Sequence, residues 1–264
     1  MKKRILLFTV VLMFIVTSNS FSQIRFGGVA GLDFARFSYL GNNSSDFSTP
    51  DSSSITANSG VTSFHFGPML EFSLADPFYL ETGLIFCGRG GEQTHTYTST
   101  IVDSFFGLTT VSTSVSDVKY TPLYIQIPII EKVKFNVGSA DIDFLVGTYF
   151  SFGIAGKYNI SSTGTTVVTG GPSPQTTTVS SSASGDIKFG SDSTSMMKSI
   201  DFGLSIGAGV EYQNFLFRLQ YIFGTTNINN ANDANSGFRH SVFTISAGYI
   251  VGNAGGKHHH HRRR

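Results

Sequence analysis

The sequence predicts an all-β protein, an eight-stranded antiparallel up-and-down transmembrane β-barrel. Three observations lead to this prediction. Apolar residues recur at every second position over long segments, which is typical of strands with one apolar and one mixed face. Short and long connections alternate along the chain, as in outer-membrane barrels with short periplasmic turns and longer outer loops. The mixed face is rich in glycine, which suits the narrow interior of a small barrel.

The first segment, 1–22, is typical of a cleaved secretory signal peptide. A basic start, Lys2 to Arg4, precedes an apolar run from Ile5 to Val16, and small residues end the segment at Ser22. An uncleaved membrane anchor is the alternative. The apolar run is shorter than the ~20 residues of a spanning helix, so we favour the cleaved signal.

The rest of the chain predicts a barrel domain at 23–252 and a basic, histidine-rich tail at 253–264. No later segment has the ~18 consecutive apolar residues of a transmembrane helix, so any membrane crossing must use strands. The single cysteine, Cys87, excludes an intramolecular disulfide. Without the seven basic residues of the two ends, 11 basic and 17 acidic residues remain. We therefore expect no nucleic-acid partner.

Eight segments have a two-residue period and are long enough to cross a bilayer as tilted strands of ~9 to 11 residues. In chain order they are Gln23–Phe37, Phe64–Leu74, Phe78–Phe86, Val118–Phe135, Ile142–Ile160, Ile200–Glu211, Phe215–Gly224 and Phe238–Val251.

The second and third segments form a hairpin around Asp76-Pro77. In the fourth, Leu123 and Ile125 lie on one face, and Tyr124 and Gln126 on the other. The fifth to eighth repeat this pattern, with phenylalanine, isoleucine and valine opposite glycine, serine and charged residues. Prolines also fall inside the strands, where each removes a ladder hydrogen bond, so we expect bulges or a local bend there. These prolines are Pro68, Pro122 and Pro128.

The connections predict which end of the barrel faces which compartment. Short turns follow the second, fourth and sixth strands, at Asp76-Pro77, Asn136–Asp141 and Gln213–Asn214. The other four connections are long and rich in Ser, Thr and Asn. Alternating Thr and Val in two of them favours hairpins that extend the barrel outward. The long connections are Ser38–Gly60, Arg89–Ser116, Lys157–Lys198 and Thr225–Gly237.

The alternation alone does not decide between a membrane barrel and a soluble, lipocalin-like barrel with its apolar face inside. Bulky residues crowd the apolar face, while the other face is dense in glycine. Bulk fits outside and glycine fits the cramped interior, so we favour a lipid-facing apolar surface. A soluble barrel that binds a ligand is the alternative.

Charged residues on the mixed face would then point into the barrel. They predict either a proton or ion path, or a plug of paired charges in a barrel too narrow for water, and we favour the plug. The glycines at Gly203, Gly207 and Gly209 share a strand face without a following helix, so we do not expect a phosphate loop. The inward residues are Arg25, Asp33, His65, Glu71, Glu81, Lys132, Lys134, Asp201, Glu211 and Arg218.

At "YIQIPIIEKVKF", "DFGLSIGAGVEY" and "RLQYIFGTTNINN" the chain resembles the PorT-like outer-membrane β-barrel family of the Bacteroidetes. The resemblance spans the mature chain and implies an eight-stranded barrel without an established activity for most members. The ending departs from the pattern, because the last strand is followed by "GNAGGKHHHHRRR" and not by an aromatic assembly signal. The matching structural positions are Tyr124, Ile127, Pro128, Lys132, Asp201, Gly203, Gly207, Gly209, Tyr221, Gly224, Asn227 and Ile228.

The residues support no catalytic, cofactor or metal site, and no nucleophile, base and acid combination stands out. We therefore expect a small, non-enzymatic barrel in the outer membrane of a Gram-negative bacterium, exported through the signal peptide. We expect a monomer in contact with outer-membrane lipid. Its long loops suggest a surface binding or structural envelope role, with an extracellular protein as a possible partner. The alternative is an accessory component of a protein-secretion or transport complex, with an envelope-complex partner.

Overall fold

The computed structural model describes residues 24–39, 52–192, 194–230 and 237–252. In this part of the chain every regular element is a β-strand, and no helix is long and apolar enough to cross a membrane. The predicted signal peptide, 1–22, and the predicted tail, 253–264, lie outside the described residues.

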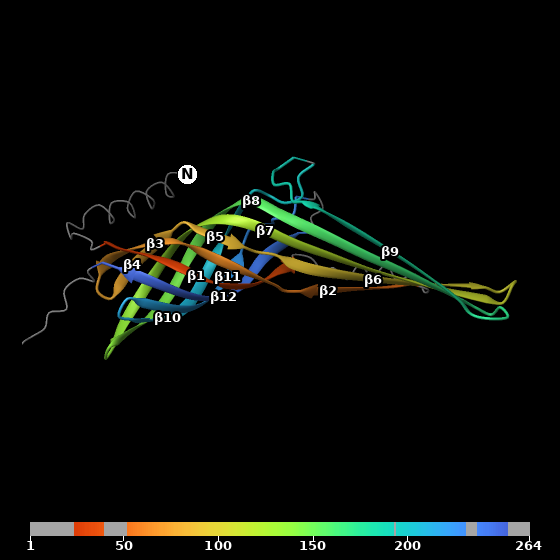
Figure 1. Cartoon of the computed structure of the whole chain (residues 1–264), viewed down its shortest axis with the longest axis horizontal. Helices are drawn as coiled ribbons and strands as arrows, with labels where there is room; N and C mark the ends of the chain where they lie inside the picture. Colours follow the sequence, from red (N-terminus) through yellow and green to blue (C-terminus); the bar gives the residue numbers. More distant parts are fainter. Residues whose placement is uncertain (1–23, 40–51, 193, 231–236, 253–264) are drawn as a thin grey trace, which may run out of the picture.

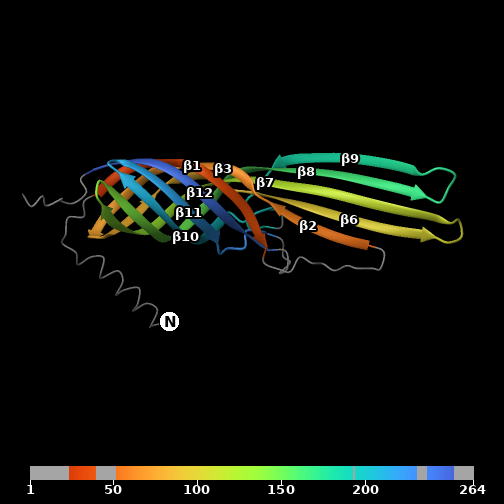
Figure 2. The same ribbon diagram turned by 90° about the horizontal axis from the view of Figure 1, so that it is seen from below.

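Twelve strands form one antiparallel sheet that is closed at one end and open at the other (Figures 1 and 2). They are β1 Ile24–Tyr39, β2 Ser52–Ser59, β3 Val61–Ala75, β4 Phe78–Gly83, β5 Ile85–Gly88, β6 Gly91–Asp103, β7 Leu108–Val137, β8 Ala140–Thr169, β9 Gln175–Asp186, β10 Ile200–Tyr212, β11 Phe215–Gly224 and β12 Phe238–Val251.

The closed part is a ring of eight strand positions, as the sequence predicts. Each ring strand pairs antiparallel with the ring strands before and after it, and β12 returns to pair with β1 over the register from Phe26↔Val251 to Tyr39↔Phe238. The β4 and β5 strands together fill one position between β3 and β7. Closure leaves no free strand edge in the ring, so the backbone of every strand has a partner on both sides.

The predicted strand bounds are confirmed closely at the C-terminal end, where β11 and β12 begin and end as expected. The β7 and β8 strands are longer than expected. Each has 30 residues and continues far beyond the ring. The segments predicted as long loops after the third and fifth strands therefore contain β-structure, as the Thr/Val alternation indicates. The loop predicted after the first strand contains β2, which the sequence analysis did not predict.

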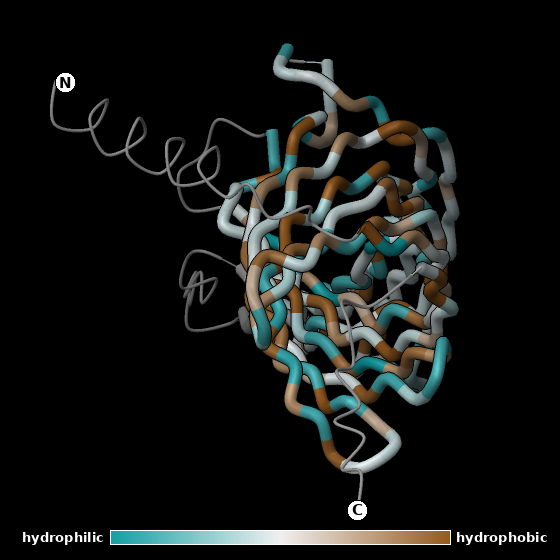
Figure 3. The backbone as a smooth tube through the Cα atoms, turned by 90° about the vertical axis from the view of Figure 1, so that its left-hand side faces the viewer, coloured by the Kyte–Doolittle hydropathy of each residue, from teal (hydrophilic) through white to brown (hydrophobic). Residues whose placement is uncertain are grey.

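Apolar side chains point outward from the ring and polar side chains point inward, which confirms the predicted faces. Phe26, Phe144 and Phe217 are 61, 55 and 57% exposed, whereas Asp143 and Glu71 are fully buried. Seen along the long axis, hydrophobic and hydrophilic residues alternate along the strands of the ring (Figure 3). A water-soluble barrel would show the opposite arrangement.

Some irregularities of the ring lie at its prolines, and a further register shift lies between Ser73 and Ala75 in β3. A register shift between Leu123 and Tyr124 follows Pro122. Pairing of β7 with β4 ends at Ile129 and resumes with β5 at Gln126, so Pro128 falls in the gap. The predicted disturbance at the prolines is thus confirmed beside Pro122. At Pro68 and Pro128 it takes the form of an interrupted neighbouring strand, because proline has no N–H to donate.

Beyond the ring, five strand segments continue as an open sheet, which we call the projecting sheet. Its order is β2, β6, the first half of β7, the second half of β8, and β9. Figure 2 shows it as a long, gently curved layer that extends away from the ring. The short turns, including Gly138–Ser139 and Gln213–Asn214, lie at the opposite end of the ring.

Candidate functional site

Two regions of the molecule gather polar groups in a defined geometry, the barrel interior and the projecting sheet. The interior consists of four layers. From the short-turn end they are an ion-pair cluster, a small cavity, a layer around Arg89, and an apolar lid.

The ion-pair cluster fills the third of the barrel nearest the short turns. Glu71 lies at its centre: its carboxylate is 2.9 Å from Nη1 of Arg25 and 2.8 Å from Nζ of Lys134, and it also pairs with Lys132. Glu211 contacts Lys134 at 2.8 Å and forms a second pair with Arg25. The described members are four cations and four carboxylates, namely Arg25, Lys132, Lys134, Arg218, Glu71, Glu81, Asp143 and Glu211.

These eight side chains come from β1, β3, β4, β7, β8, β10 and β11, so the cluster joins seven strands around the ring. Buried charges are tolerated when they are paired, and the equal numbers of positive and negative groups satisfy this condition. The predicted plug of paired charges is therefore confirmed for the residues that the structure describes.

Arg89 crosses the barrel at the next polar level toward the projecting sheet. Its guanidinium donates to Oδ2 of Asp201 at 3.0 Å and to Gln126, and it lies 4.4 Å from the ring centre of Tyr149. The Tyr149 hydroxyl donates to the same Asp201 oxygen at 2.9 Å. A cation between a carboxylate and an aromatic face is held on both sides, so Arg89 closes the centre of the barrel.

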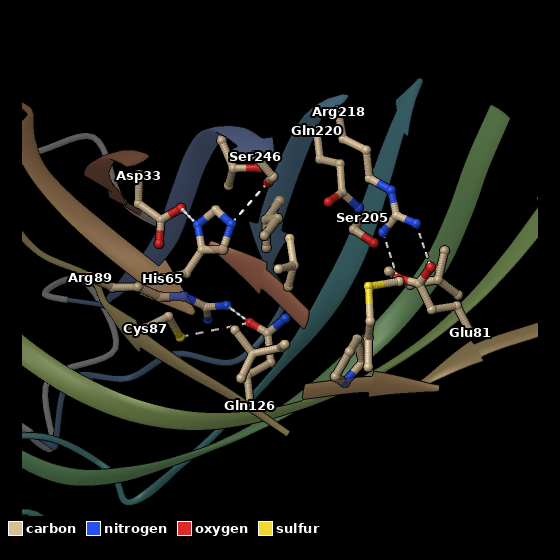
Figure 4. A pocket seen from close by; sticks show the side chains of 17 residues that line it. Asp33, His65, Glu81, Cys87, Arg89, Gln126, Ser205, Arg218, Gln220 and Ser246 are labelled. Atoms are coloured by element: carbon tan, nitrogen blue, oxygen red, sulfur yellow. Dashed lines mark hydrogen bonds and ion pairs between the residues drawn. The ribbon is translucent and has the colours of Figure 1, made fainter. Parts of the chain in front are cut away.

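A cavity of about 50 Å³ lies between the ion-pair cluster and Arg89 (Figure 4). On its wall, Asp33 Oδ1 is 2.7 Å from His65 Nδ1, and His65 Nε2 is 2.9 Å from Ser246 Oγ. This is the hydrogen-bond order that activates serine in hydrolases. Sequence analysis missed it because the three residues lie on β1, β3 and β12. Alternation places each of them inward, but only the register brings them together.

The size of this cavity decides against acyl transfer. A volume of this kind needs only ~10–15 Å³ to hold one water molecule, so the cavity has room for a few waters but not for an acyl substrate. The ion-pair cluster and Arg89 bound it on the two sides along the barrel axis. The arrangement of Asp33, His65 and Ser246 therefore supports a structural hydrogen-bond chain that joins three strands.

An apolar lid covers Arg89 on the side of the projecting sheet. Phe189 packs edge-on against Tyr124 with ring centres 5.7 Å apart. Asn227 Oδ1 accepts hydrogen bonds from the backbone N–H groups of Asn229 and Phe238, which holds the last connection against the lid. The buried core of the lid consists of Phe37, Ile187, Met197, Ile228 and Phe238.

On the outer side of the lid, two described residues donate hydrogen bonds to the carboxylate of Asp192. The Asp192 carboxylate accepts hydrogen bonds from the Ser195 hydroxyl and from the hydroxyl and backbone N–H of Thr194. These bonds lower the pKa of the exposed Asp192 carboxyl, because they favour its charged form.

The residues of the family-like motif are divided between these layers. Tyr124 and Asp201 belong to the Arg89 layer, where the Tyr124 hydroxyl is 3.1 Å from His240 Nε2. Lys132 belongs to the ion-pair cluster and Asn227 to the lid. Pro128 lines the cavity and Gly224 approaches His240, whereas Ile127 and Tyr221 point outward. The motif residues therefore have structural roles in the barrel, and they do not come together at a single site.

The glycines of the motif on β10 allow neighbouring backbone and side-chain atoms to come close to this strand inside the barrel. A Cβ on Gly203 would lie 2.3 Å from the Phe223 carbonyl oxygen and 2.7 Å from the Tyr149 ring. A Cβ on Gly207 would lie 2.5 Å from the Leu219 carbonyl oxygen. No side chain fits at such distances, so these positions need glycine for packing and not for phosphate binding.

The projecting sheet has a different chemistry. Its strands are joined by cross-strand hydroxyl pairs, such as Ser116 with Ser162 at 3.0 Å and Thr163 with Ser180 at 3.2 Å. Across residues 96–116 and 158–185 the sequence carries a single charge, Asp103. Both faces of β9 are exposed along its length. Beyond the charged residues at its base, the sheet is therefore a neutral, hydroxyl-rich surface, and β9 has one edge that no described strand pairs with.

A closed ring with an apolar outer surface and a polar interior is the architecture of a membrane barrel. Residues 8–230 match the model of the outer membrane protein beta-barrel domain family. The chain belongs to this family. Its ring is therefore a barrel of the Gram-negative outer membrane, whose apolar surface contacts lipid. The match does not distinguish a PorT-like subfamily, so that prediction stays a prediction.

Solved structures with some likeness include two outer-membrane proteins. Ail, the attachment invasion locus protein of Yersinia pestis, crystallised with the heparin analogue sucrose octasulfate, is 12% identical over 87% of this chain and 99% of its own, with a TM-score of 0.29. Neisserial surface protein A is 10% identical over 85% of this chain and 96% of its own, with a TM-score of 0.31. No match was found among curated proteins.

Residues that could hold a metal ion are also not grouped. Among the described residues, no three histidine, cysteine, aspartate or glutamate side chains are placed to share a cation. The carboxylates of the ion-pair cluster are instead occupied by lysine and arginine. Cys87 is buried against the cavity, where it packs as a small apolar side chain.

Proposed function

We propose that this chain is a small, non-enzymatic outer-membrane barrel that displays the projecting sheet at the cell surface as a binding surface. The observation that carries the proposal is the continuity of β7 and β8 from the ring into the sheet over 30 residues each. Such continuity makes the sheet a rigid extension of the barrel and not a set of loops.

The closed interior supports the same proposal. Paired charges, Arg89 and the lid occupy the described interior in succession. A barrel with its interior filled in this way anchors the projecting sheet in the membrane and does not serve as a channel for solutes. The signal peptide cleaved after Ser22, the monomeric state and a PorT-like relationship belong to this proposal as expectations.

The chemistry of the sheet limits the classes of partner that it can bind. The structure of Ail contains a heparin analogue, a sulfated polyanion. In this chain the cations nearest the projecting sheet are Lys119 and Lys157 at its base, and residues 96–116 and 158–185 have none. We therefore expect a neutral partner, recognised through backbone, hydroxyl and apolar contacts, and not a polyanion.

A shortened chain tests the proposal. Removal of Gln93–Val118 and Ser161–Ser182, with a two-residue Asn-Gly turn at each join, deletes most of the sheet at paired positions. Heat-dependent gel mobility would show whether the shortened barrel still folds. We expect cells that display the full chain to adhere to epithelial monolayers or to second bacterial cells, and the shortened chain to lose this adherence. Equal adherence of both chains would contradict the proposal.

The alternative is an accessory role in protein secretion or transport. It remains a prediction that the same pair of chains can test. Envelope proteins that co-purify equally with the full and the shortened chain would favour it, because the short turns and the ring would then suffice for the interaction.

A further inference from the structure

The far end of the projecting sheet carries an exposed apolar tip. It is the turn between β6 and β7, at residues 101–108, and it is the part of the yellow hairpin farthest from the ring (Figures 1 and 2). Phe105 and Phe106 are 87 and 67% exposed, and Ile101 and Val102 are 65 and 64% exposed. These values equal or exceed those of the lipid-facing side chains of the barrel.

The tip is held in a defined conformation. Asp103 Oδ1 accepts hydrogen bonds from the backbone N–H of Phe105 at 2.9 Å and of Phe106 at 3.1 Å. Gly107 completes the turn with a φ of 64°. The two phenylalanine rings meet edge to face with centres 4.9 Å apart. The turn therefore presents both rings outward in a fixed geometry, which lowers the entropic cost of binding.

The neighbouring hairpin supports the tip. Gly170, in the turn between β8 and β9, lies so close to Gly107 that a Cβ there would be 2.0 Å from the Gly107 carbonyl oxygen. The two hairpin ends are thus packed together. The apolar tip is consequently the end of a broad, stiff sheet.

We propose that this tip inserts into the interface of a neutral lipid bilayer that faces the cell, such as another cell or a vesicle. The inference rests on the proposed function and names its partner. The tip is convex, so a protein partner would need a matching apolar pocket, whereas a fluid bilayer accepts any convex apolar end. The projecting sheet extends away from the barrel, so the bilayer is not the one that holds the chain.

Charge selects the kind of bilayer. The one charged residue near the tip, Asp103, uses a carboxylate oxygen to bind its own turn. Without nearby cations the tip gains no attraction to anionic lipid, so zwitterionic phosphatidylcholine should bind as well as anionic lipid or better. Ser104, Thr109 and Thr110 lie next to the apolar residues in the sequence, and their hydroxyls suit the headgroup region.

The chain contains no tryptophan, which permits a direct test. Phe105→Trp places a single fluorophore at the tip of the full chain in nanodiscs. Adding phosphatidylcholine vesicles should shift its emission to the blue, and brominated phosphatidylcholine should quench it. Nanodiscs without vesicles supply the baseline. An unchanged spectrum, or binding restricted to phosphatidylglycerol vesicles, would overturn the inference.

Binding is measured in parallel by vesicle flotation. The double change Phe105→Ser and Phe106→Ser should lower vesicle binding by at least about tenfold per side chain. Val179→Ser is the matched control, because Val179 is also 67% exposed but lies on β9 away from the turn. Equal losses in the control would overturn the inference. Cell adherence that survives the double change but not the shortened chain would overturn the lipid partner and leave the proposed function standing.

Discussion

The β7 and β8 strands each cross two environments, and the two halves differ in chemistry. In the ring, β7 alternates exposed apolar residues such as Ile129 with buried charges such as Lys132 and Lys134. In the projecting sheet, the same strand carries hydroxyls and valines without a charge from Leu108 to Ser116. The ring is stabilised by lipid outside and ion pairs inside, whereas the sheet depends on its ladder and hydroxyl pairs.

The difference shows that one continuous strand can be stabilised by different interactions in different parts of its length. Burial makes single substitutions costly in the ring, and exposure makes them tolerable in the sheet. Matched substitutions in the two regions should therefore have very different effects.

The largest effect is expected for Glu71→Leu. This change removes the carboxylate shared by Arg25, Lys132 and Lys134, so the buried cluster keeps four cations but only three carboxylates. We expect a loss of about 3–5 kcal/mol in the free energy of unfolding. The measurement is urea unfolding of the detergent-solubilised barrel. Glu92→Gln in the projecting sheet is the control, and a loss below about 1 kcal/mol for Glu71→Leu would refute the plug.

Val146→Arg places a charge on the lipid-facing surface of β8. Because Val146 is 56% exposed on the outside of the ring, we expect a cost of about 2–4 kcal/mol in lipid. Val179→Arg introduces the same side chain in the projecting sheet, where water solvates it, and should cost less than about 0.5 kcal/mol. Folding into vesicles measures both. Similar costs would argue that the two surfaces face the same medium.

Gly203→Ala adds one methyl group where the Phe223 carbonyl oxygen would be 2.3 Å away. Overpacking should cost about 1–3 kcal/mol. Its counterpart is Gly164→Ala in the projecting sheet, where the nearest atom would be 4.0 Å away. We expect this second change to be neutral or slightly stabilising, and unfolding midpoints compare the two. A neutral Gly203→Ala would show that the close approach is not needed.

The smallest effect is expected for Thr113→Ala, which removes the hydroxyl pair with Thr98 at 3.3 Å. The expected loss is about 0.2–1 kcal/mol, confined to the projecting sheet. Hydrogen exchange should become faster in β6 and β7 near this pair, with the ring unchanged. Faster exchange in the ring would show that the two regions unfold together.

Much of the ring was predictable from the sequence because its residues obey one rule. The alternation placed Phe144 outside and Asp143 inside, and the bounds of β11 and β12 follow from it directly. The plug was also predictable, since charges on the inward face of a narrow barrel have to pair.

The remaining features depend on register and closure. The contact of His65 with Asp33 and Ser246 joins positions 32 and 181 residues apart, and no local pattern encodes it. The extent of the projecting sheet was underestimated because Ser and Thr are typical of loops as well as exposed strands. The role of Arg89 was missed because it lies in a segment that reads as a loop, next to Gly90.

The central claim is that the projecting sheet stands outside the cell on a barrel embedded in the outer membrane. Labelling of single cysteines on intact cells with a bulky, membrane-impermeant maleimide tests it most directly. Cys87 is 3% exposed and should not be labelled. We expect Thr178→Cys in β9 to be labelled, and Ser139→Cys in a short turn to be labelled only after the outer membrane is permeabilised. Labelling of Ser139→Cys but not Thr178→Cys on intact cells would contradict the account.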